Sequence, residues 1–111
     1  MGEWKHAGTF GFDKPSDDIS FCTDSRGVIH AVARNGTELR HYMRGSENPF
    51  PWEAEGRVIP GTYIGSGHIE IWKDGNLFII WPNDAGKNET WWENPLNFGD
   101  PSHPSPALVP E

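Results

Sequence analysis

The sequence predicts an all-β protein built from two four-stranded antiparallel meanders. Three observations predict this class: helical spacing of apolar residues is almost absent, short runs are rich in β-branched and aromatic residues, and turn-forming residues separate these runs. The chain has 13 Gly and 10 Pro among 111 residues. Its length fits a single domain with one modest core.

The first meander is expected to have four strands, at residues 19–23, 28–34, 37–43 and 52–59. The sequence "DSRG" (24–27) is expected to form the turn between the first two strands. Asn35-Gly36 is expected to form a two-residue turn between the second and third, which would place Arg34 opposite Thr37. Residues 44–51 are expected to form a loop, because they contain two prolines, which cannot donate a hydrogen bond to a sheet.

The second meander is expected to have strands at residues 62–65, 68–73, 76–81 and 89–94. Asp74-Gly75 fits a two-residue turn, which would place Trp72 opposite Leu77 and Ile71 opposite Phe78. This register puts apolar side chains on both faces of the hairpin, whereas a hairpin with one wet face would alternate apolar and polar residues. Both faces of this sheet are therefore expected to be covered.

The two meanders share features at matching positions. Trp4, Trp52 and Trp92 each have an apolar residue six positions further on, which suggests repeat units at about 4–51 and 52–94. Repeats of this length are typical of propellers, whose sheets are covered on both faces by their neighbours. Two units cannot close a ring, so closure would need other copies of the chain, with a strand around Trp4 completing a neighbouring blade. The alternative is one eight-stranded sandwich or barrel, capped by the N-terminal segment and the C-terminal tail.

The C-terminal tail, residues 96–111, is rich in proline and follows a β domain that spans residues 1–95. Such a segment is extended when it stands alone. We expect it to dock on its own domain or on a partner. The expected docking residues are Leu96, Phe98, Leu108 and Val109.

Composition and charge exclude several classes of protein. The net charge of −7 argues against a general nucleic-acid binder and against a polybasic membrane anchor. Cys22 is the only cysteine, so no internal disulfide can form, and its apolar neighbours indicate a buried thiol. No charged and then apolar leader indicates a signal peptide, and no run reaches the roughly 18–20 apolar residues that span a bilayer. We therefore expect cytoplasmic synthesis.

One stretch resembles a known family. In "GVIHAVARNGTELRHYMRGSENPFPWEAEGRVIPG" (27–61), the segments "ARNGTELRHY" and "WEAEG" occupy the places of the turn and of the Trp–Gly motif in a blade of the bacterial propeller lectins. The segment "GSGHIEIWKDGNLFIIW" (65–81) is similar to the same blade less closely. The resemblance implies a carbohydrate-binding protein with two blades per chain, completed by oligomerisation.

Several residues are of the types that bind sugars. Exposed tryptophans stack on sugar rings, while carboxylates and arginines hold the hydroxyl groups. Trp91 and Trp92 should point to opposite faces of one strand, so one of the two is expected to be exposed. An alternative role for Trp52 and Trp92 is packing in the core. The expected ligand-binding residues are Trp52, Glu53, Trp91, Trp92, Glu93, Arg34 and Arg40.

Motifs of catalysis and metal binding are sparse. "IGSGH" (64–68) lacks the strand–turn–helix context of a nucleophile elbow, and no phosphate-binding or dinucleotide-binding loop occurs. His30 and His41 should face each other across the first hairpin, with Cys22 opposite Ile29 on the other face. Two histidines are too few for a zinc site. We expect no metal, no cofactor and no enzymatic activity.

Three functions follow from these observations. The first is a non-enzymatic, lectin-like oligomer whose partners are a glycan and other copies of itself. The second is a structural component of a larger assembly, such as a phage capsid decoration or tail protein, whose C-terminal tail would bind other proteins of the virion. The third is a small acidic inhibitor that mimics nucleic acid.

Overall fold

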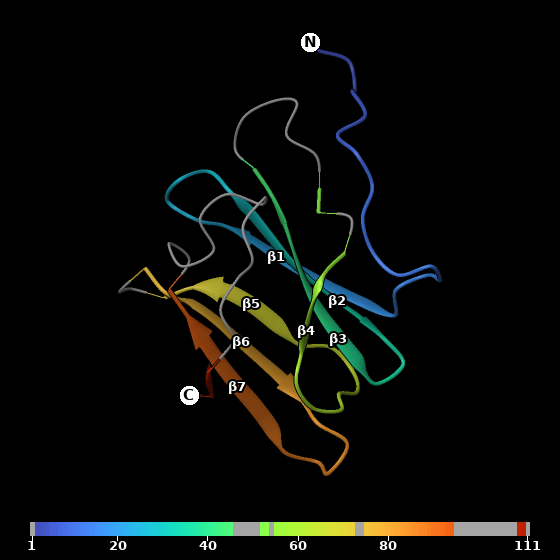
Figure 1. Cartoon of the computed structure of the whole chain (residues 1–111), viewed down its shortest axis with the longest axis vertical. Coiled ribbons are helices and arrows are strands. Elements are labelled where there is room, and N and C mark those ends of the chain that lie inside the picture. The colour runs from blue at the N-terminus through green and yellow to red at the C-terminus, as the bar shows by residue number, and fades with distance from the viewer. Residues whose placement is uncertain (1, 46–51, 54, 73–74, 95–108, 111) are drawn as a thin grey trace.

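The computed structural model describes residues 2–45, 52–53, 55–72, 75–94 and 109–110. All regular structure in these residues is β-strand, as the sequence predicts (Figure 1). No helix among them is long and apolar enough to cross a membrane.

The first sheet is a four-stranded antiparallel meander in which every strand pairs with the next one along the chain. β2 is buried along most of its length because it has a strand on each side and is covered on both faces. The fourth strand is shorter than predicted, and Trp52 forms only an isolated bridge to Arg44. The strands are β1 (Asp18–Thr23), β2 (Ile29–Asn35), β3 (Glu38–Arg44) and β4 (Arg57–Ile59).

The second sheet contains three antiparallel strands and a two-residue strand paired with its last one: β5 (His68–Ile71), β6 (Leu77–Pro82), β7 (Asn88–Glu93) and β8 (Val109–Pro110). The strand predicted at 62–65 is not formed. Tyr63 makes only a single bridge to Asn83, because the chain turns at Gly61 and Gly65, which both have positive φ.

The tail residues expected to dock fall largely outside the described residues. The backbone of Val109 pairs with Trp92 in β7. Leu96, Phe98 and Leu108 lie outside the described part of the chain.

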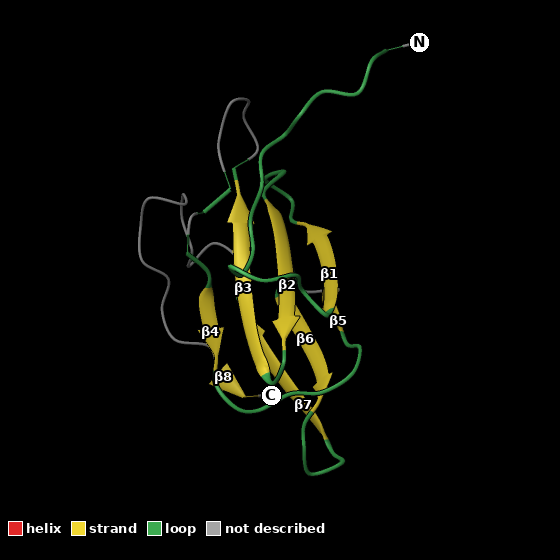
Figure 2. Cartoon of the chain, turned by 90° about the vertical axis from the view of Figure 1, so that its right-hand side faces the viewer, coloured by secondary structure: helices red, strands yellow, loops and turns green. Residues whose placement is uncertain are grey.

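The two sheets face each other across one shared core (Figure 2). β1 lies beside β5 along one edge, where the Ser20 hydroxyl accepts a hydrogen bond from the Ile69 amide at 3.0 Å. The described strands do not close into a barrel. The core is formed by Val28, Val32, Leu39, Met43, Ile59, Tyr63, Ile69, Leu77, Ile79 and Trp81.

The register predicted for the first hairpin is wrong by two residues. Asn35 pairs with Glu38, so the turn consists of Gly36 and Thr37 and not of Asn35-Gly36. Gly36 has φ +60°, whereas Thr37 does not have a positive φ. This pattern belongs to a type II′ turn, which needs glycine at its first central position. Asn35 uses its side chain elsewhere, donating to the Pro15 carbonyl at 2.7 Å.

The register predicted for the second hairpin is wrong by one residue. Ile71, and not Trp72, pairs with Leu77. The Gly75 amide donates to the Trp72 carbonyl and the Trp72 amide donates to the Asn76 carbonyl, with Gly75 at φ +86°. Trp72 and Asn76 are therefore joined by these bonds across the turn, and Asp74 of the predicted Asp74-Gly75 turn lies outside the described residues.

This shift of one residue changes which side chains face the core. In the observed register Ile69 and Ile71 point inward while His68 and Glu70 point outward, so β5 alternates as an amphipathic strand should. Apolar side chains on the outer face come chiefly from β6 and β7. The apolar outer face is therefore smaller than the predicted register implied.

The N-terminal segment, defined as residues 2–17, crosses the outer face of the first sheet without forming a strand (Figure 2). Within one chain no strand forms around Trp4: Trp4 is fully exposed, and positive φ angles at Gly8 and Gly11 interrupt the extended backbone. Phe10 stacks on Trp52 with ring centres 4.0 Å apart. The N-terminal segment thus covers part of the outer face of the first sheet, whereas Trp72 and Trp92 on the outer face of the second sheet are exposed.

Candidate functional site

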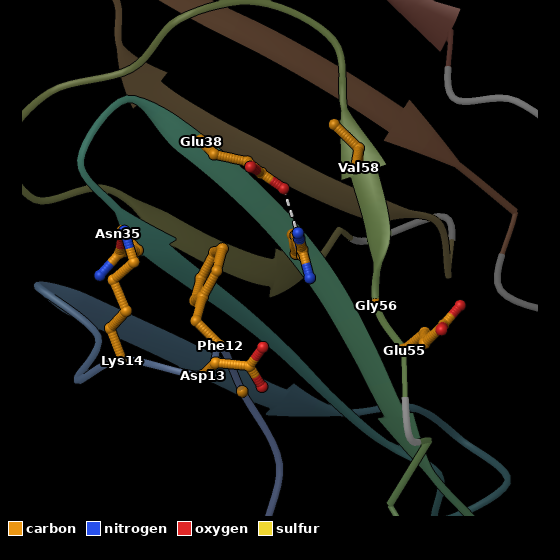
Figure 3. Close-up of a pocket in the computed structure, with 10 residues that line it drawn as sticks. Phe12, Asp13, Lys14, Asn35, Glu38, Glu55, Gly56 and Val58 are labelled. Atoms are coloured by element: carbon orange, nitrogen blue, oxygen red, sulfur yellow. Dashed lines mark hydrogen bonds and ion pairs between the residues drawn. The ribbon is translucent and has the colours of Figure 1, made fainter.

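A pocket of about 700 Å³ opens between the N-terminal segment and the outer face of β3 and β4 (Figure 3). Three separate parts of the chain form its walls: the N-terminal segment, the tip of the β2–β3 hairpin, and the residues around the start of β4. The lining residues are Gly11, Phe12, Asp13, Lys14, Asn35, Glu38, Arg40, Glu55, Gly56 and Val58.

Local packing fixes the walls of the pocket. Gly56 lies so close to the ring of Tyr42 that a Cβ atom there would be 2.8 Å from it, so the chain can cross at this point only as glycine. On the other side, the N-terminal segment is tied to the first hairpin, because the Gly36 amide donates to the Asp17 carboxylate at 2.7 Å. The hollow therefore lies between two anchored pieces of backbone.

Arg40 is the central charged group of the pocket. Its guanidinium donates to the Glu38 carboxylate, which raises the pKa of Arg40, and lies 4.7 Å from the ring centre of Phe12. An ion pair on one side and an aromatic face on the other restrict the rotamers of Arg40. One donor-rich group is thereby held in place within the pocket.

The remaining charges of the pocket are exposed. Asp13, Lys14 and Glu55 are all open to solvent and form no ion pair with another described residue. With Glu38 and Arg40 paired to each other, the lining carries one more negative than positive charge. Carboxylates accept hydrogen bonds, and lysine and arginine donate them, so the walls offer both kinds of group to a polar ligand.

The apolar part of the lining comes from Phe12 and Val58. Val58 is 59% exposed although it lies within a strand, because its side chain projects from the outer face beside the pocket. A few convergent polar groups beside apolar walls are typical of sites that bind small molecules. The arrangement can bind a ligand that has both hydroxyl groups and an apolar face.

Among the residues predicted to bind ligand, only Arg40 lines the pocket. Arg34 instead connects the two sheets: it pairs with Asp18 at 2.7 Å and donates to the Gly65 carbonyl at 2.9 Å. Glu53 accepts hydrogen bonds from the Met43 amide and the Arg57 guanidinium. The contacts of Arg34 and Glu53 are therefore structural.

The predicted tryptophans lie on different surfaces. Trp91 and Trp92 point to opposite faces of β7, as predicted: Trp91 packs against the core and donates to the Tyr63 hydroxyl at 2.9 Å, while Trp92 is exposed. Glu93 is buried on the same inner face as Trp91. Trp52 lies half-buried under Phe10 on the first sheet. The structure does not bring these residues together.

A second surface of interest, here called the aromatic surface, consists of Trp72, Phe78 and Trp92 on the outer face of the second sheet. Phe78 pairs with Trp92 in the strand register. Phe78 also stacks on Trp72, with ring centres 4.2 Å apart and planes 9° from parallel. Trp72 and Trp92 are each 37% exposed. Exposed aromatic side chains that lie next to one another often mark an interaction site.

A polar cluster is buried on the inner face of the first sheet. His30 and His41 lie side by side as predicted, although diagonally across the ladder, because His30 pairs with Met43. Cys22 is opposite His30 and not opposite Ile29, so that prediction is wrong. Burial raises the pKa of the Cys22 thiol to about 11, which makes it a poor nucleophile at neutral pH.

No group of three or more His, Cys, Asp or Glu side chains in the described ranges is placed to hold a metal ion. Asp24 and the two histidines instead bond to one another.

Most of the pocket was missed by reasoning from sequence. Phe12, Asp13 and Lys14 belong to a stretch without strand periodicity, and nothing in its sequence indicates that it crosses the first sheet. Glu38 and Glu55 are ordinary strand and loop residues when viewed alone. Only the tertiary fold brings residues 11–14 beside residues 55–58.

The chain was compared with known proteins. No protein-family model matches it, and a search of curated proteins gives no match.

Proposed function

We propose that this protein is a non-enzymatic carbohydrate-binding module and that the pocket between the N-terminal segment and β4 is its sugar site. The observation that carries this proposal is the composition of the pocket lining. Fixed donors and acceptors, led by the Arg40–Glu38 pair, lie beside the apolar walls of Phe12 and Val58.

This combination suits the chemistry of a sugar. Each hydroxyl group can donate one hydrogen bond and accept others, and the faces of the ring carry apolar C–H groups. The Glu55 and Asp13 carboxylates would accept from hydroxyl groups, and Lys14 would donate to them. The volume of about 700 Å³ lies within the range of small-molecule sites.

Oligomerisation of the chain is part of the proposal. The resemblance to bacterial propeller lectins implies several copies, each presenting its own pocket. Shallow, polar sugar sites bind weakly, and several linked sites raise the overall affinity by making later binding events intramolecular. The oligomer would thus provide the affinity that one open pocket lacks.

The proposal is tested by binding the purified protein to an immobilised glycan panel and titrating the best glycan by calorimetry. We expect Glu55→Ala to weaken binding about tenfold or more, because one hydrogen bond to a charged group is worth about 1.5–3 kcal/mol. Glu70→Ala is the matched control, since Glu70 is exposed on the second sheet, outside the pocket, and its loss should leave the affinity unchanged. Absence of any glycan binding, or equal losses in both variants, would contradict the proposal.

The aromatic surface favours a second candidate function, a structural component of a larger assembly. Side chains of this kind bury large apolar areas in protein interfaces. In that case Trp92→Ala should prevent assembly, measured by light scattering. Glu55→Ala, measured in the same way, should leave assembly unchanged. A protein that binds no glycan and loses its oligomeric state with Trp92→Ala would favour this second function over the first.

A further inference from the structure

Behind the pocket, on the inner side of the first sheet, lies a row of three buried polar side chains from the β1–β2 turn, β2 and β3. His30 Nε2 is 2.8 Å from the Asp24 carboxylate, and His30 Nδ1 is 2.9 Å from His41 Nε2. The two imidazole rings are stacked 5.1 Å apart and are at most 1% exposed. We call these three residues the histidine cluster.

The hydrogen bonds of the cluster determine where its protons are. Asp24 also accepts from the Arg26 guanidinium at 2.9 Å and from the Arg26 amide at 2.8 Å, so it is a carboxylate with several donors around it. His30 therefore donates to Asp24 through Nε2, which leaves Nδ1 of a neutral His30 as an acceptor. When both rings are neutral, His41 donates to it through its own Nε2. A further proton on Nδ1 of His30 would meet that N–H unless His41 gave it up.

The charged groups around the cluster oppose protonation on most sides. Arg57 of β4 lies opposite His41 in the register and pairs with Glu53, and Arg26 lies at the Asp24 end. The Asp24 carboxylate is in direct contact with the His30 ring. Of the other titratable groups on the inner faces, Cys22 of β1 lies opposite His30 in the register, and Glu93 of β7 is buried on the inner face of the second sheet.

Burial lowers the pKa of His30 below its usual value, although Asp24 partly offsets this effect. Burial lowers the pKa of His41 further, and the neighbouring His30 and Arg57 add to the decrease. The neutral forms are thus the ones that the folded cluster accommodates.

The histidine cluster and the pocket share their backbone. His41 stands between Arg40 and Tyr42 on β3, and Arg57 stands between Gly56 and Val58 on β4. Because neighbouring residues of a strand point to opposite faces, the outer faces of β3 and β4 carry pocket residues, while their inner faces carry His41 of the cluster and Arg57 beside it. A movement of β3 away from β2 would therefore also move Arg40 in the wall of the pocket.

We propose that the histidine cluster is a proton-sensitive latch, which holds β3 against β2 and the Asp24 turn at neutral pH and loosens the β3 wall of the pocket on acidification. This inference deepens the proposed function, since it concerns regulation of the same site and release of its ligand in acid. The latch itself is a property of the ligand-free protein and can be tested without a glycan.

Acidification should favour the opened state of the latch, because the closed and opened states bind different numbers of protons. In the closed state both histidines are neutral with lowered pKa values, whereas in an opened state they are exposed with pKa values of about 6.5. The opened state therefore binds more protons as the pH falls below about 6.5, and the closed state loses its advantage there. The opening equilibrium should rise by up to about tenfold per pH unit for each histidine exposed.

The test is amide hydrogen exchange followed by nuclear magnetic resonance on the full chain between pH 7.5 and pH 5. We expect the protection factors of Arg40 and Arg57 to fall at least fivefold between pH 6.5 and pH 5.5, while those of Ile79 and Trp91 in the second sheet change by less than twofold. Equal losses in both sheets, or no loss down to pH 5, would overturn the latch.

Two variants test the assignment to the cluster. His41→Leu removes the second imidazole and should abolish the selective acid loss in β3 and β4. If His41→Leu does not fold, His30→Gln, which keeps a donor toward Asp24, should give the same flattening. A selective loss that persists in a folded variant would overturn the role of the histidines.

The outcome for the ligand separates the two proposals. If a glycan binds at pH 7.5, its affinity should fall together with the protection of Arg40 and Arg57. Loss of protection without loss of affinity would overturn the coupling between latch and pocket. A latch that titrates as expected in a protein that binds no glycan at any pH would contradict the proposed function alone.

Discussion

Glu53 and Glu55 show how two residues of one type, two positions apart, can take different roles. The Glu53 side chain is only 9% exposed and bonds to both the Met43 amide and the Arg57 guanidinium. Glu55 is exposed at the rim of the pocket. The sequence favoured Glu53 as the ligand-binding carboxylate because it follows a tryptophan, but its hydrogen bonds already have partners within the protein.

The two glutamates should therefore separate stability from binding. Glu53→Ala removes the acceptor of the buried Met43 amide and the ion pair to Arg57, so we expect the free energy of unfolding to decrease by about 2–3 kcal/mol. Glu55→Ala should change it by less than about 0.5 kcal/mol, as surface substitutions usually do. Urea denaturation followed by tryptophan fluorescence measures both. Similar losses of stability in the two variants would contradict these roles.

Residue type predicted one residue of the pocket, Arg40, and strand geometry predicted two arrangements outside it. The opposite orientations of Trp91 and Trp92 follow from strand geometry and are confirmed, as is the proximity of His30 and His41. Which tryptophan faces the core depends on how the second sheet packs, and this information is not local. The same limit applies to Phe12, whose position depends on the path of the N-terminal segment.

At the level of the strands, both hairpins were predicted at the right places but with wrong registers. Asn-Gly and Asp-Gly dipeptides indicate that a turn is present, yet each glycine can serve more than one turn type. In the first hairpin Gly36 is the first central residue, and in the second the Gly75 amide donates to the Trp72 carbonyl. Both turn types place glycine at a position with positive φ, so the local preference of glycine did not distinguish the alternatives.

The turn assignment predicts different effects at two adjacent positions. Gly36→Ala should decrease the free energy of unfolding by about 1–2 kcal/mol, because alanine is strained at φ +60°. The backbone alone accounts for this loss, since no other atom lies within 4 Å of an added Cβ. Thr37→Ala, at the second central position, is the control and should have little effect because Thr37 has no positive φ. Thermal unfolding by circular dichroism compares them, and equal shifts in melting temperature would contradict the turn assignment.

At the scale of the whole molecule, the alternation of short strands and turns was enough to predict two antiparallel meanders. The sequence left open what covers each sheet, because that depends on contacts between distant parts of the chain. The inner faces cover each other across the shared core, and residues 10–17 cover part of the outer face of the first sheet. The N-terminal segment thus serves both as cover for Trp52 and Tyr42 and as a wall of the pocket.

Two deletions divide the N-terminal segment by function. Deletion of residues 2–9 removes the fully exposed Trp4 but leaves Phe10 on Trp52, so the melting temperature should change by only a few degrees. Deletion of residues 2–16 also removes the aromatic cover and one wall of the pocket. It should decrease the free energy of unfolding by about 3 kcal/mol, since burial of a single aromatic side chain is worth about 1.5–3 kcal/mol.

Light scattering and glycan titration on the same two deletion variants then distinguish the role of Trp4 from the role of residues 10–16, which pack on the first sheet. If Trp4 completes a neighbouring copy, as the propeller hypothesis requires, deletion of residues 2–9 will reduce the oligomeric mass although each chain stays folded. If the chain is a self-contained sandwich, this deletion will leave mass and binding unchanged, and only the longer deletion will abolish binding. Full binding after the longer deletion would show that the pocket is not the site, because Phe12, Asp13 and Lys14 would all be absent.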